Sequence, residues 1–263
     1  MTVGQNEVRP VPVPRNVARA LARTGGLIGA ALLAGTVKDG AILEAGLEAG
    51  SSGGGGVKWM VLFGIIGIVL LVLTTGLANL MFLGGKLRGE ITRGNVAAGV
   101  ISAGHSVAMG LILGGCFYGR DLQSLSVSAV FFFIGVATLL GLQRLYRLLT
   151  HYADDQETLG ENSAAAIGFV GVTLAFAIIV AHAADGAFVG WAASLRAYGL
   201  ALLLALALFP VRQLVVGPLL LGLPARVRGG GLDRLVGQER DVVVAVIEAA
   251  AYVAAALLAT GVG

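Results

Sequence analysis

The sequence predicts an all-α protein, a polytopic transmembrane helical bundle of about seven helices built from repeated two-helix units. Hydrophobic residues make up 57% of the 263 residues, charged residues only 13%, and the mean hydropathy is +0.88. Ordinary soluble domains carry about 25% charged residues, so this composition indicates an integral membrane protein. The apolar residues run in long blocks without the alternation of a β-barrel, and the spans must therefore be helices.

Seven blocks of the chain are candidate spans, since a bilayer core needs about 20 apolar residues per helix. The first block is the weakest, because its arginines followed by an apolar stretch also fit a secretory signal peptide. We expect it to be the first helix of the bundle. The sixth block contains Pro210 and Pro218, which predict a break in that helix. The predicted spans are residues 17–35, 57–84, 96–118, 124–150, 163–182, 189–221 and 241–260.

The basic residues predict the orientation of the bundle. With seven spans, 14 of the 18 lysines and arginines fall on the side of the N-terminus and four on the opposite side. Short cytoplasmic loops of membrane proteins carry an excess of Lys and Arg. We therefore expect the N-terminus in the cytoplasm and the C-terminus outside.

Four segments begin alike, which indicates an internal repeat. Each opens with polar residues and runs into small ones: RNVARALARTGGLIGAALLAG from Arg15, GNVAAGVISAGHSVAMGLILGG from Gly94, ENSAAAIGFVGVTLAFAIIVAHA from Glu161 and ERDVVVAVIEAAAYVAAALLATG from Glu239. We take Asn16, Asn95, Asn162 and Arg240 as position zero of each copy. A small residue then occupies position nine of every copy, namely Gly25, Gly104, Gly171 and Ala249.

The repeat unit consists of a bulky apolar helix, a charged loop and a small-residue helix. A half-repeat with its linker is expected at residues 1–56, and full units are expected at residues 57–123, 124–188 and 189–263. The linker that follows Gly35 is expected to be flexible or weakly helical.

The segment LRGEITRGNVAAGVISAGHSVAMGLILGG, and more weakly ENSAAAIGFVGVTLAFA, resembles the bacterial inner-membrane family called domain of unknown function 350 (DUF350). The copies that begin at Asn16 and Arg240 depart from this pattern, since the last has Arg240 and Asp241 where Asn would stand. The resemblance implies a multi-pass protein of the bacterial inner (plasma) membrane. It implies no established activity and no catalytic residues.

Asn95 and Asn162 stand directly before apolar runs, where an Asn side chain caps a helix by accepting a backbone N–H. An alternative is that the helix N-termini together hold an anion. The helix after Asn95 carries small residues at intervals of four, which form a stripe for close helix packing, within the bundle or between subunits of a homo-oligomer. A path for a small solute is the alternative for this stripe, which consists of Ala98, Ser102, Ser106, Gly110 and Gly114.

Glu248 and His105 are ionisable residues well inside predicted spans, where such groups are costly and normally face protein or water. Glu248 lies eight residues after Arg240, and His105 lies ten residues after Asn95. This near-equal register predicts a permeation or ion site at mid-membrane, at a repeat interface. The alternative is a buried structural pair, or a protonated Glu248 that is hydrogen-bonded to a neighbour.

The sequence carries no pattern of known enzyme chemistry. Cys116 is the only cysteine and the three histidines are scattered, so no metal site is predicted. HExxH, GxSxG and P-loop motifs are absent, and we expect no catalytic activity, no cofactor and no binding to nucleic acid. A cluster of four acidic residues is interpreted as a solvated loop, with docking of a cytoplasmic partner or a polycation as the alternative: Asp154, Asp155, Glu157 and Glu161.

Two hypotheses for function follow. The first is a channel or transporter for a small solute or ion, with Glu248 and His105 as the polar groups at its middle. The second is a non-transporting scaffold or accessory subunit that assembles in the lipid bilayer through its small-residue helices.

Overall fold

The computed structural model describes residues 16–47, 55–117, 121–148, 150, 152–185, 188–226 and 230–261. Within these residues the chain is all-α and contains no strand, which confirms the predicted fold class. The elements are α1 (Val17–Leu47), α2 (Gly55–Leu83), α3 (Leu87–Arg93), α4 (Val96–Cys116), α5 (Leu122–Arg147), α6 (Asp154–Leu159), α7 (Ser163–Ala184), α8 (Trp191–Ala207), the π-helix η1 (Arg212–Leu220), α9 (Gly231–Asp233), the π-helix η2 (Arg234–Gln238) and α10 (Val242–Thr260).

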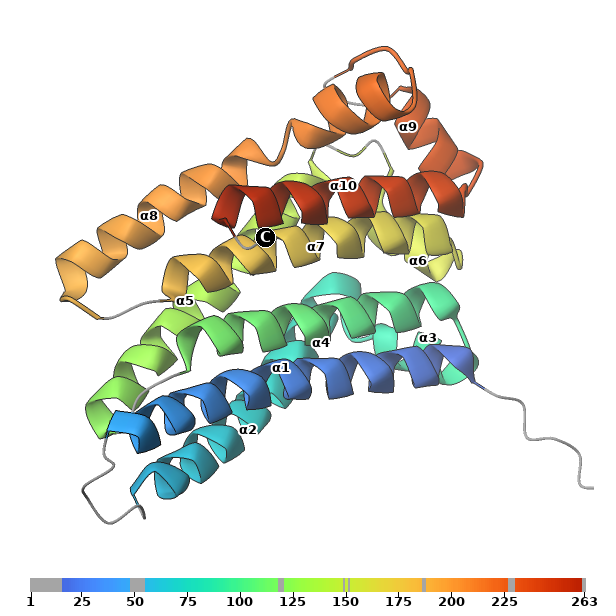
Figure 1. Cartoon of the computed structure of the whole chain (residues 1–263). Coiled ribbons are helices and arrows are strands. Elements are labelled where there is room, and N and C mark those ends of the chain that lie inside the picture. The colour runs from blue at the N-terminus through green and yellow to red at the C-terminus, as the bar shows by residue number, and fades with distance from the viewer. Residues whose placement is uncertain are drawn as a thin grey trace, which may run out of the picture.

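The four small-residue helices form a single row through the molecule. In Figure 1, α1, α4, α7 and α10 lie as successive layers and run in the same direction. α4 packs against α1 and α7, and α7 packs against α4 and α10. The bulky helices α2, α5 and α8 run in the opposite direction and cover this row; α5, for example, contacts both α4 and α7.

Glycine at position nine lets neighbouring helices of the row approach closely. A Cβ atom added there would overlap the residue at position eight of the next helix, counted for the last helix from Asp241 as explained below, so only glycine fits without a shift. The same contact occurs at all three interfaces of the row: Gly25 with Ala103, Gly104 with Val170, and Gly171 with Ala249.

The structure corrects the register that the sequence analysis assigned to the last copy. Asp241, not Arg240, is the N-cap of α10, because its side chain accepts hydrogen bonds from the N–H groups of Val243 and Val244. Arg240 has a positive φ of 57° and is the counterpart of Glu161, whose φ is 63°. With Asp241 as position zero, Glu248 moves from position eight to position seven.

Six helices in the described part of the chain are long and apolar enough to cross a membrane, which supports a multi-pass membrane protein. The sixth predicted span, residues 189–221, is divided: α8 is a shorter apolar helix that ends at Ala207, and η1 follows with Pro218 inside it. The predicted break in this helix is therefore present. α1 continues to Leu47, well beyond the predicted end at Gly35.

Candidate functional site

Asn95 joins two successive repeat units through one side chain. Its Oδ1 accepts the N–H of Ala98 at 3.1 Å and caps α4. Its Nδ2 donates to the backbone carbonyl of Thr158 on α6, at 2.8 Å, and to the carboxylate of Glu90, at 2.9 Å. An Asn side chain can do both because it carries an acceptor and two donor hydrogens.

The other two asparagines that begin helices of the row make the same pair of interactions, a helix cap and a hydrogen bond to the next unit, which we call an asparagine tie. Asn16 accepts the N–H of Arg19 and donates to the carbonyl of Ile91, at 2.9 Å. Asn162 caps α7 and donates to the carbonyls of Val236, at 2.9 Å, and Gly237, at 3.3 Å. Each donor therefore reaches the last residues of the short helix in the next unit. At the equivalent position Asp241 only accepts, because a carboxylate has no N–H to donate.

His105 lies inside the bundle with no exposed surface and is part of a polar cluster with Asn79 and Ser102. Its Nδ1 is 2.8 Å from the Oδ1 of Asn79, and the Nδ2 of Asn79 donates to the Ser102 hydroxyl at 3.1 Å. Since a carbonyl oxygen only accepts, Nδ1 carries the ring proton and Nε2 is left as an acceptor. No donor among the described residues reaches Nε2. Phe82 and Phe169 surround the ring with edge-on contacts.

A crevice of about 630 Å³ opens at the end of the bundle where α3 lies, and we call it the Arg19–Arg88 crevice. Asn79 and Ser102 form part of its wall, so the crevice leads to the cluster that contains His105. Its lining comes from α1, α2, α3, α4 and the turn before α3: Arg19, Gly76, Asn79, Leu80, Gly85, Leu87, Arg88, Ile91, Thr92 and Ser102.

Glu248 is also fully buried, at a different interface. Its Oε1 accepts the hydroxyl hydrogen of Tyr146 from α5, at 3.1 Å. Its Oε2 lies beside α7, where a Cβ on Gly168 would stand 3.5 Å away, in ordinary van der Waals contact. The Tyr146 ring also meets the Tyr252 ring of α10 edge-on.

The structure does not bring Glu248 and His105 together. α7 packs between α4, which carries His105, and α10, which carries Glu248. Their partners also come from different helices, Asn79 on α2 and Tyr146 on α5. The two residues therefore lie at different interfaces of α7, and a permeation or ion site that they share stays a prediction. Sequence register indicates depth along a helix axis, whereas the interface depends on the side of the helix that a residue occupies.

The predicted stripe on α4 has two roles. Ser106, Gly110 and Gly114 face α1; a Cβ on Gly110 would lie 2.5 Å from the Cα of Gly29. Ala98 is fully buried, whereas Ser102 lies in the wall of the Arg19–Arg88 crevice.

The acidic residues after α5 are not a free solvated loop. Asp154 is only 2% exposed and lies 3.7 Å from Arg147, which also approaches Asp155 at 3.6 Å. Glu157 accepts a hydrogen bond from Asn162, and Glu161 lies 3.5 Å from Arg93. All four carboxylates thus contact groups within the chain. The prediction of a solvated segment therefore fails for the buried Asp154, whereas the side chains of Asp155 and Glu161 are 46% and 59% exposed.

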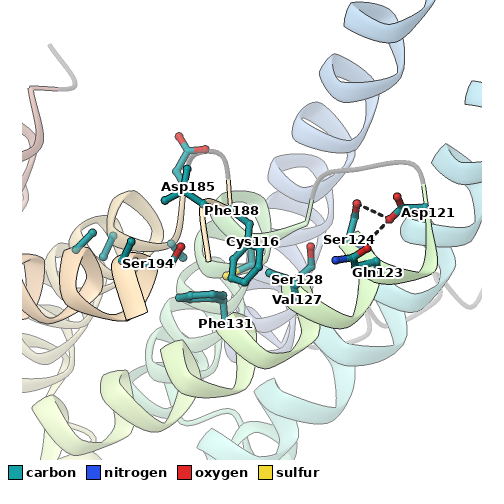
Figure 2. A pocket seen from close by; sticks show the side chains of 15 residues that line it. Cys116, Asp121, Gln123, Ser124, Val127, Ser128, Phe131, Asp185, Phe188 and Ser194 are labelled. Atoms are coloured by element: carbon teal, nitrogen blue, oxygen red, sulfur yellow. Dashed lines mark hydrogen bonds between the residues drawn. The ribbon is translucent and has the colours of Figure 1, made fainter. Parts of the chain in front are cut away.

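A second cavity, of about 440 Å³, lies at the opposite end of the bundle, and we call it the Cys116 cavity. Cys116 is the last residue of α4 and is 2% exposed. Figure 2 shows Cys116 and Phe131 near the middle of the cavity, with Ser194 on one side and Ser124 on the other. Asp121 caps α5 through its bonds to Ser124. Sequence reasoning did not find this cavity, because its walls come from the ends of α4, α5, α7 and α8.

Comparison with known proteins gives one family. Residues 11–117 and 121–262 match, as two tandem copies, the family described as Domain of Unknown Function (DUF350). No curated protein and no solved structure matches the chain.

Proposed function

The chain belongs to the DUF350 family, and from this premise we propose that it is a permeation protein for a small solute, which enters through the Arg19–Arg88 crevice. The observation that carries the proposal is the link between the crevice and His105. Asn79 lies in the crevice wall and holds the ring of His105 through its amide oxygen. A solute in the crevice thus meets a chain of polar groups that continues into the bundle.

The burial of His105 supports this role. Ionisable residues inside membrane spans are costly and mark solute pathways more often than ordinary core positions do. The Nε2 of His105, which no described donor reaches, provides an acceptor for a solute or a water molecule. Glu248 stands outside this path and holds α5 to α10 through Tyr146.

Beyond His105 the path is closed. Ala108, Met109 and Ile112 follow on α4, and all three are fully buried. The Cys116 cavity lies past this apolar layer. Passage therefore requires a rearrangement of the helices between the two cavities, as in transporters that expose a site to one side at a time. The proposal assigns no catalytic step to the chain.

The distribution of basic residues supports a cytoplasmic position for the crevice in a bacterial inner membrane. Arg19 and Arg88 belong to the side that carries 14 of the 18 basic residues. On this basis the N-terminus is cytoplasmic and the C-terminus is outside.

A scaffold that does not transport is the second candidate. The three asparagine ties and the close packing of α1, α4, α7 and α10 favour it, because they fasten each helix of the row to the next. In this case His105 and Glu248 serve only to join helices.

Solute uptake by a variant whose crevice is narrowed distinguishes the permeation protein from the scaffold. Gly76 lines the crevice and has no heavy atom within 4 Å of an added Cβ, so Gly76→Leu adds bulk to the crevice wall from a position with open surroundings. Gly64, on the same helix, has equally open surroundings and lies outside the lining residues, so Gly64→Leu is the matched control.

We expect the parent and Gly64→Leu in proteoliposomes to take up at least one solute from a set of radiolabelled inorganic ions, glycerol 3-phosphate and putrescine. Gly76→Leu should reduce that uptake about tenfold, since the added side chain occupies the entry. No uptake by the parent, or equal uptake by both variants, would contradict permeation and favour the scaffold.

A further inference from the structure

We propose that the Arg19–Arg88 crevice binds a phosphate group, carried either by a soluble phosphate ester or by the headgroup of an anionic phospholipid. This inference names the ligand class of the entry site and rests on the proposed function of the crevice.

The charge of the crevice is positive and uncompensated. Arg19 and Arg88 are its two charged lining residues, and no lining residue is acidic. Among the described residues, neither guanidinium takes part in an ion pair. Three other arginines at the same end are paired: Arg93 with Glu90, Arg147 with Asp154 and Arg234 with Glu239. The crevice lacks such a carboxylate and gathers two unpaired arginines in one lining.

The donors of the crevice match the chemistry of a phosphate. A guanidinium presents a planar fork of N–H groups that binds phosphate oxygens in pairs, and two of them suit a doubly charged group better than a single carboxylate. Ser102 is 7% exposed and accepts a hydrogen bond from Asn79. In the described part of the chain no acceptor takes its hydroxyl hydrogen, which leaves Ser102 able to donate to a bound oxygen.

The position of the crevice fits both sources of phosphate. It lies where α2 ends and α3 begins, between the span Lys58–Leu83 and the charged segment after it. Leu80 and Gly76 form an apolar wall that is exposed on α2. Basic pockets between membrane helices on the cytoplasmic side bind phospholipid headgroups, and the same groups bind a soluble ester.

Two binding measurements on the purified full-length chain test this inference and distinguish the sources. In the first, the chain in nanodiscs of neutral phosphatidylcholine is titrated with glycerol 3-phosphate, with glycerol as the probe that lacks phosphate. In the second, the chain is incubated with vesicles of phosphatidylglycerol and phosphatidylcholine, and the lipids that it retains are counted by native mass spectrometry.

Arg19→Gln and Arg88→Gln remove the proposed ligands of the phosphate. Arg234→Gln is the matched control, because it removes the same charge from an exposed arginine outside the crevice. We expect each crevice variant to weaken binding of the phosphate probe about tenfold and the control to change it less than twofold. Arg88→Lys should bind with intermediate affinity, since it keeps the charge and loses the fork.

Binding of glycerol 3-phosphate alone assigns the site to a soluble ester, and retention of phosphatidylglycerol alone assigns it to a lipid. Either result supports the inference if Arg19→Gln and Arg88→Gln lose that binding. Binding of neither probe, or binding that all variants keep, would overturn it. Phosphate binding without solute uptake contradicts permeation only, whereas uptake without phosphate binding contradicts this inference only.

Discussion

Asn95 on α4 donates its side-chain N–H to the carbonyl of Thr158 on α6, 63 residues later in the chain, at 2.8 Å. The bond joins the helix cap of one unit to the short helix of the next, and both groups are buried. Because Asn16 and Asn162 make the corresponding bonds, each unit of the row is fastened to its successor. The last unit has Asp241 at this position and makes no such bond.

Asn95→Asp should destabilise the chain although it keeps the helix cap. The carboxylate still accepts the N–H of Ala98, but the donor to Thr158 is lost and a negative charge is placed beside Glu90. A buried carbonyl without its donor costs about 1 to 3 kcal/mol, so the melting temperature should fall. Asp241→Asn is the control and should have little effect. Equal melting temperatures for Asn95→Asp and the parent would show that the tie contributes nothing.

Gly110→Leu should disrupt the contact between α1 and α4. Its side chain would meet the backbone of Gly29, which cannot move aside without separating the two helices. Overpacking of this kind costs about 1 to 3 kcal/mol or more. Gly26→Leu on α1 is the control, because an added Cβ there meets no atom within 4 Å. Thermal melts in detergent check the difference, and a Gly110→Leu protein that melts with the parent would contradict the close approach.

The stability of the chain should depend on pH through Glu90, which lies on α3 outside the spans. The hydrogen bond from Asn95 and the neighbouring Arg93 hold the pKa of Glu90 below its ordinary value of 4.5, although desolvation by partial burial acts in the opposite direction. Since the folded-state pKa is the lower one, the carboxylate stabilises the fold above about pH 4.5. This contribution is lost as the pH falls through the folded-state pKa.

Glu90→Gln should therefore lower the melting temperature at pH 7, and the difference from the parent should narrow at pH 3.5. Glu239→Gln, which removes a half-exposed carboxylate paired with Arg234, should show a smaller difference at pH 7. If the melting temperature of Glu90→Gln differs from that of the parent by the same amount at both pH values, the assigned role of Glu90 is contradicted.

The row of helices and their caps could be predicted because both depend on local sequence. An Asn before a run of small residues sets the start of a helix, and small residues mark the faces that approach closely. The ties to Ile91, Thr158 and Gly237 could not be predicted in this way, because they join groups 63 to 75 residues apart. The sequence shows that Asp241 stands where the other copies have Asn. That this replacement removes a hydrogen-bond donor between units is clear only once the accepting carbonyls are known.

The site was predicted less well than the fold. Burial of Glu248 and His105 follows from their place in apolar spans, yet their separation by α7 depends on which side of each helix they occupy. In the sequence, Arg19 and Arg88 are two of the 14 basic residues that indicate the orientation of the bundle, and nothing there links them to each other. Their common crevice arises from the meeting of α1, α2, α3 and α4, which no local pattern specifies.

The central claim, that an open crevice leads from the cytoplasm to the His105 cluster, is tested most directly by the accessibility of Ser102. In a Cys116→Ala background, Ser102→Cys should react with a membrane-impermeant methanethiosulfonate reagent in inside-out vesicles, because Ser102 lines the crevice. Ala108→Cys, six residues later on α4 and fully buried, should react from neither side. A Ser102→Cys protein that stays unmodified in inside-out vesicles, or that reacts only in right-side-out vesicles, would contradict the account.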